Sequence, residues 1–101
     1  MRLVITPLAE RDIEAIGDYI AQDSPKRAAS FVIELHSQCL KIASAPHIYR
    51  LRHELGDDIR SCTYGKYVIF FQVASQVVHI VRVLHGARDI RIRFSEPDSG
   101  H

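Results

Sequence analysis

The sequence predicts an α+β fold in the order β-α-α-β-β-β, an antiparallel sheet with an N-terminal helical hairpin packed on one face. Three observations predict it. Apolar residues recur every three or four positions through residues 7–44, the period of an amphipathic helix. From residue 59, runs rich in Val, Ile and aromatic residues are separated by short polar turns, as in a β-meander. Neither helix can cover the whole apolar stripe of the other, so a sheet is needed.

Length and composition are those of one ordinary globular domain. The chain has 101 residues, 47% of them hydrophobic and 25% charged, with a net charge of +1. That charge excludes a global basic field of the kind that binds nucleic acid nonspecifically. We expect a single domain over residues 1–94 and a disordered polar tail over 95–101. No apolar run approaches the length of a membrane span, and the two cysteines suggest reduced thiols, so we expect a cytoplasmic protein.

The first half begins with a short strand at residues 3–5 and continues as two helices. Thr6-Pro7 and Ser24-Pro25 each place a capping hydroxyl before a proline, a start signal for helices over residues 7–22 and 25–44. Ala45-Pro46 ends the second helix. The short link between the helices predicts an antiparallel hairpin. The residues expected to face inward are Ala9, Ile13, Ile16 and Ile20, then Ala28, Phe31, Val32, Leu35, Cys39 and Ile42.

The second half reads as a connector over residues 47–58 and three strands, at 59–64, 67–73 and 77–85, with Gly65-Lys66 as a tight turn. Strict alternation in the last strand places Val81 and Val83 on one face and Arg82 on the other. A guanidinium inside so apolar a strand is costly unless it is paired or solvated. Arg82 is therefore either a structural, salt-bridged arginine or the mark of a functional face.

The usual catalytic signatures are missing. Neither a GxGxxG motif nor a P-loop occurs, and the six histidines are scattered, so we expect no cofactor and no metal. One set could carry chemistry: Arg60, Arg82, His85 and Glu54. If the strands pair as neighbours, Arg60, Tyr64 and Arg82 converge on the sheet face away from the helices. Such a set suits RNA phosphodiester cleavage, yet the same surface would equally accept an acidic, hydrophobic peptide.

Several motifs, taken in order, make the chain resemble ParE-type toxins of the RelE/ParE superfamily, the toxic half of type II toxin–antitoxin pairs. The run Val83-Leu84-His85-Gly86-Ala87-Arg88-Asp89 is the most specific. The other matching motifs are Tyr19-Ile20-Ala21, Ser24-Pro25, Ala28-Ala29, Arg50-x-Arg52-x-Glu54-Leu55, Arg60-Ser61 and Tyr64-Gly65-Lys66-Tyr67-Val68-Ile69-Phe70-Phe71. One departure is visible, because the connector reads Ile48-Tyr49-Arg50 where a glycine commonly precedes the arginine.

The resemblance implies partners as well as a fold. It implies a cognate, ParD-like antitoxin that wraps the helical hairpin and the sheet groove in a hetero-oligomer and contacts operator DNA itself. The toxin residues expected to meet the antitoxin are Ile13, Ile16, Ile20, Phe31, Leu35, Arg60, Tyr64 and Arg82. Exposed apolar surface of this kind predicts that the toxin without its antitoxin self-associates.

The resemblance leaves the target between two branches. RelE-type members cut ribosome-bound mRNA with basic residues and a C-terminal Tyr or His, whereas ParE-type members poison DNA gyrase by binding. No Tyr follows Tyr67 and no Lys cluster occurs in the connector, which favours the gyrase poison. The residues expected to bind that target are Arg88, Asp89, Arg91, Arg93 and Phe94. The alternatives are a ribosome-dependent endoribonuclease using Arg60, Arg82, His85 and Glu54, and a non-toxic corepressor.

Overall fold

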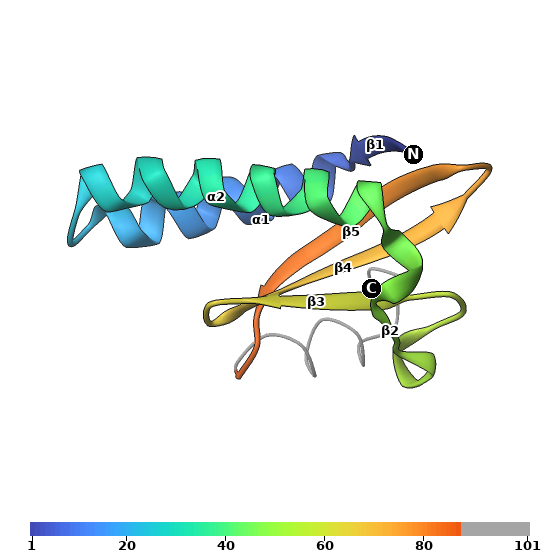
Figure 1. Cartoon of the computed structure of the whole chain (residues 1–101). Helices are drawn as coiled ribbons and strands as arrows, with labels where there is room; N and C mark the ends of the chain where they lie inside the picture. Colours follow the sequence, from blue (N-terminus) through green and yellow to red (C-terminus); the bar gives the residue numbers. More distant parts are fainter. Residues whose placement is uncertain (88–101) are drawn as a thin grey trace.

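A helical hairpin lies along one face of a five-stranded sheet in the computed structural model, which describes residues 1–87 (Figure 1). The predicted tail at 95–101 and the predicted target-binding residues from Arg88 to Phe94 lie outside the described residues. The helices are α1 (Pro7–Ala21) and α2 (Pro25–Ser44), with 3-10 turns η1 (Pro46–Ile48) and η2 (His53–Leu55). The strands are β1 (Arg2–Ile5), β2 (Arg50–Leu51), β3 (Arg60–Tyr64), β4 (Tyr67–Ala74) and β5 (Val77–His85).

Both helices begin where the capping signals predicted. The Thr6 hydroxyl oxygen accepts a hydrogen bond of 3.2 Å from the Ala9 N–H, and the Ser24 hydroxyl oxygen accepts one of 3.1 Å from the Arg27 N–H. Each cap satisfies a backbone donor that the first helical turn cannot satisfy itself. The predicted inward stripe is also confirmed, since Ala9, Leu35 and further members of it form the core.

The sheet has the order β1-β5-β4-β3-β2 and is mixed, whereas a purely antiparallel sheet was expected. β2 to β5 pair antiparallel, but β1 pairs parallel to β5, with Arg2 opposite Val77 and Ile5 opposite Ile80. The meander leaves one edge of β5 open, and β1 fills its first half before the chain turns into α1. Pairing of β2 with β3 makes part of the predicted connector a fifth strand.

A β-bulge interrupts β5 and corrects the predicted alternation. Pairing with β4 is regular up to Ile80, skips Val81 and resumes with Arg82 opposite Phe70. A bulge inserts one unpaired residue and reverses the side-chain phase beyond it. Ile80 and Val83, which strict alternation put on opposite faces, consequently belong to the same core.

The sheet separates two apolar clusters. The larger one fills the space between the helices and the sheet, and its fully buried members include Leu35, Ile42, Ile69, Phe71 and Ile80. The smaller cluster on the other face consists of Ile59, Val68, Phe70 and Leu84, with Leu55 and Val81 packed against it. Within residues 1–87, neither helix combines the length and the apolar character that crossing a membrane requires.

Candidate functional site

Arg82 is held by an aspartate from α1, so the structure agrees with the salt-bridged reading of this residue. Its Nε and Nη2 donate to the two carboxylate oxygens of Asp12, each at 2.8 Å. The same carboxylate accepts the Val83 N–H at 2.9 Å, on the edge of β5 that β1 does not reach. The side chains of Arg82 and Asp12 are only 14% and 11% exposed. This bidentate pair ties α1 to the last strand.

Arg60 and Arg82 do not converge, so the predicted cluster on the far sheet face is wrong. Arg60 lies opposite Phe71 on β4 and Arg82 lies opposite the adjacent Phe70. Directly paired residues share a face and adjacent residues alternate, so the two arginines start from opposite faces. The Nη1 of Arg60 donates to the Tyr49 carbonyl at 2.7 Å, whereas Arg82 donates to Asp12. The bulge and the sheet order decide this arrangement.

Tyr64, the third member of that cluster, faces the helices. Its hydroxyl donates to Glu34 on α2 at 2.7 Å, and its ring packs against Phe31 with 5.7 Å between centroids. Arg27 donates to the same carboxylate at 2.6 Å and lies over the Phe31 ring. Both hydrogen bonds lower the pKa of Glu34, and that from Arg27 has the larger effect. This network was not predicted, and its only signal in the sequence is the helical spacing of Arg27, Phe31 and Glu34.

His85 and Glu54 have separate surroundings. The His85 ring meets the Tyr67 ring edge-on at 5.5 Å, and its Nδ1 accepts the Ala87 N–H at 3.2 Å. Glu54 in η2 accepts a 2.7 Å hydrogen bond from Arg52, which lowers the pKa of its carboxyl group. A carboxyl group stabilised as the anion suits a base or an ion pair better than a proton donor.

Four of the eight predicted antitoxin-binding residues are buried in the chain's own core. Ile13, Ile16, Phe31 and Leu35 are 2%, 7%, 6% and 0% exposed, so a partner cannot reach them on the folded chain. The helical periodicity that singled them out marks the sheet-facing stripe. Ile20, Arg60, Tyr64 and Arg82 are partly buried. The large apolar side chains that α2 does expose are Ile33 at 66% and Leu40 at 63%.

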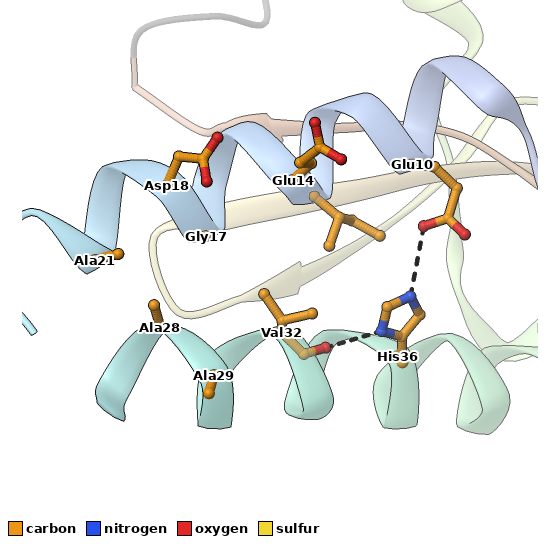
Figure 2. A pocket seen from close by; sticks show the side chains of 10 residues that line it. Glu10, Glu14, Gly17, Asp18, Ala21, Ala28, Ala29, Val32 and His36 are labelled. Carbon is orange, nitrogen blue, oxygen red and sulfur yellow. Dashed lines mark hydrogen bonds and ion pairs between the residues drawn. The ribbon is translucent and has the colours of Figure 1, made fainter. Parts of the chain in front are cut away.

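A groove runs between α1 and α2 and has a volume of about 660 Å³ (Figure 2). Along α1 it is lined by the carboxylates of Glu10, Glu14 and Asp18. The α2 side and the floor are small or apolar; their lining residues are Gly17, Ala21, Ala28, Ala29 and Val32. A methyl group added at Gly17 would lie 3.1 Å from the Val32 side chain, so the missing side chain lets the helices approach closely.

Among residues 1–87, one histidine lines the groove. The His36 Nε2 lies 3.5 Å from a Glu10 carboxylate oxygen, and its Nδ1 lies 3.1 Å from the Val32 carbonyl (Figure 2). Because a carbonyl can only accept, the Nδ1 must be the donor in that contact. The salt bridges among the described residues include neither Glu14 nor Asp18. The groove therefore presents unneutralised negative charge along one wall.

The described part of the chain contains neither a disulfide bond nor a group of side chains that could bind a metal ion. No group of three His, Cys, Asp or Glu side chains among residues 1–87 is placed to hold a metal ion. Cys39 and Cys62 are buried free thiols, and burial raises the pKa of Cys39 to about 12. A thiol with so high a pKa is a weak nucleophile at neutral pH.

The fold and the motifs define a small toxin of a toxin–antitoxin system. The family model for the ParE toxin of the type II toxin–antitoxin system parDE matches residues 3–90, and the chain belongs to this family. It is 36% identical over 87 residues to Toxin RelE2 of Caulobacter vibrioides, covering 86% of this chain and 97% of that protein.

A solved structure shares the fold. The chromosomal ParDE toxin–antitoxin system from P. aeruginosa contains a chain that superposes with a TM-score of 0.74 and 23% identity, covering 84% of this chain and 95% of that one. Membership of the ParDE family implies an antitoxin partner. The predicted fold class and family are thereby confirmed.

Proposed function

We propose that this toxin inhibits DNA gyrase by binding and does not cleave RNA. The observation that supports this most is the engagement of Arg82, whose Nε and Nη2 both donate to Asp12 on α1. A phosphate clamp needs guanidinium N–H groups directed at the substrate. Two other residues of the ribonuclease set also bond to different parts of the fold. Arg60 donates to the Tyr49 carbonyl, and Glu54 accepts a hydrogen bond from Arg52.

In this proposal the target-binding segment is the one that follows β5. Residues 88–94 hold Arg88, Asp89, Arg91, Arg93 and Phe94, a set of charged groups and one aromatic ring that can anchor an interface. The cytoplasm, where gyrase works on DNA, is the compartment in which the toxin would act.

The antitoxin, in the same proposal, is ParD-like and covers exposed rather than buried residues. On α2, Ile33 and Leu40 provide apolar surface that a partner can bury. Ile20 and Tyr64 are partly exposed and can contact the antitoxin at the edge of this interface. Operator DNA would be bound through the antitoxin, as part of a hetero-oligomer.

The test is a paired assay of the full chain, separated from its antitoxin, on gyrase supercoiling and on ribosome-bound mRNA. Inhibited supercoiling with intact mRNA is the expected result. Cut mRNA with unaffected gyrase would overturn the proposal in favour of the endoribonuclease, and silence in both from folded protein would overturn it in favour of the corepressor.

Variants locate the target-binding segment. Arg91→Ala with Arg93→Ala should weaken gyrase inhibition about tenfold or more, because two interface arginines are lost. The matched control is Arg50→Ala, an exposed arginine on β2 at the opposite edge of the sheet from β1. Equal loss of inhibition in both variants would show that the segment has no special role.

A further inference from the structure

The groove between α1 and α2 has two chemically different walls (Figure 2). Glu10, Glu14 and Asp18 are spaced four residues apart, so they form one line of carboxylates with a rise of about 6 Å per step. Facing them, α2 contributes Ala28, Ala29 and Val32. An occupant that satisfies both walls must carry cations along one side and apolar groups along the other.

One segment of this chain has that pattern. Residues 88–94 read Arg-Asp-Ile-Arg-Ile-Arg-Phe, in which Ile90, Ile92 and Phe94 alternate with Arg91 and Arg93. In an extended peptide, alternate side chains project to opposite sides, and residues two apart are separated by about 6.6 Å. That separation is close to the step between Glu14 and Asp18. An extended segment lying in the groove would direct Arg91 and Arg93 to α1 and its apolar side chains to α2.

We propose that the groove binds residues 88–94 of a second copy of this chain. The volume of about 660 Å³ is within the range of about 300–1000 Å³ typical of pockets for small molecules, so the groove can take several side chains of the segment. Reciprocal exchange closes the assembly as a dimer with both grooves filled, whereas a one-way exchange would continue into a chain. Because one sequence supplies both the acidic wall and the matching basic segment, two copies can fill each other's grooves.

The self-association expected of the isolated toxin would then rest on ion pairs with α1 and apolar contacts with α2. The segment that enters the groove is the one assigned above to target binding, so the dimer withholds it. Self-association needs no gyrase, and its measurement therefore fails or succeeds independently of the target proposal.

The experiment is sedimentation velocity of the full chain at several concentrations and two salt concentrations. The wild type should associate with rising concentration, and more weakly in high salt because the contacts are surface ion pairs. Glu14→Arg with Asp18→Arg, and separately Arg91→Glu with Arg93→Glu, should each weaken association about tenfold or more, since attraction becomes repulsion. Asp57→Arg, an exposed acid in the connector, is the control and should associate as the wild type does.

A charge exchange makes the test specific. Mixing the two double variants should restore association, because the arginines placed in one groove meet the glutamates placed in the other copy's segment. A wild-type monomer at every concentration overturns the proposal and leaves the groove to another occupant such as the antitoxin. Association unchanged by both double variants, or not restored by mixing them, also overturns it. Circular dichroism confirms that each variant is folded.

Discussion

Replacing Asp12 by alanine removes the partner that keeps a guanidinium in the fold. Arg82 would lose both hydrogen bonds of 2.8 Å, and the Val83 N–H would lose its acceptor at 2.9 Å. Breaking a buried ion pair by deleting one partner costs roughly 3–5 kcal/mol. The two side chains keep 14% and 11% exposure, which places this case at the lower end, at about 3 kcal/mol. Domains of this size have a free energy of unfolding of about 5–15 kcal/mol, so the loss is a large share.

Urea unfolding followed by circular dichroism measures the effect, at one fixed protein concentration because association shifts apparent stability. Arg11→Ala, an exposed residue on the same helix that does not line the groove, is the control and should change the free energy of unfolding by less than about 0.5 kcal/mol. In a double-mutant cycle, adding Arg82→Ala to Asp12→Ala should cost much less than Arg82→Ala costs in the wild type. A loss below about 1 kcal/mol for Asp12→Ala would refute the role given to the pair.

Two further predictions use the pKa shifts. The pKa of Glu34 is lowered, so its ionised form stabilises the fold above the unfolded-state pKa and that contribution is lost as the pH falls through the folded pKa. Glu34→Gln should therefore lose less stability than the wild type between about pH 5 and pH 3, and parallel acid-unfolding curves would contradict this. Burial raises the pKa of Cys39 to about 12, so in a Cys62→Ser variant iodoacetamide at about pH 8 should label it only in denaturant. Rapid labelling of the native variant, measured by mass spectrometry, would show that the thiol is accessible.

Local sequence signals predicted most of the fold because their physical causes are local. Thr6 and Ser24 cap the helices that they precede, and each acts within three residues. The inward helical stripe followed from the 3.6-residue period for the same reason. The strands of the meander were found from β-branched runs and turns. The pairing of strands distant in sequence was not predicted, as the parallel pairing of β1 with β5 shows.

The candidate site depended on the features that sequence left unresolved. Val and Ile occupy both faces of β5, so the residues give no mark of the bulge at Val81, and that bulge decides where Arg82 projects. Asp12 lies 70 positions from Arg82, and no spacing rule connects them. Four of the residues expected to meet the antitoxin are core residues instead, because an apolar stripe has the same pattern whether it packs on its own sheet or on a partner. Ile33 and Leu40, which α2 exposes, lie outside that stripe, so the helical period gave no reason to single them out.

The parallel pairing of β1 with β5 has a consequence for how the chain folds. Arg2 is paired with Val77, and the Thr6 hydroxyl and N–H both donate to the Ile80 carbonyl, so the start of the protein completes its contacts only when nearly the whole domain exists. Contacts between residues so far apart in sequence close large loops and form late. During synthesis the helical hairpin precedes the sheet, and its sheet-facing side is fully covered only once β5 has emerged. A chain that ends before β5 therefore lacks the pairing partner of β1 and the core residues Val78, Ile80 and Val83.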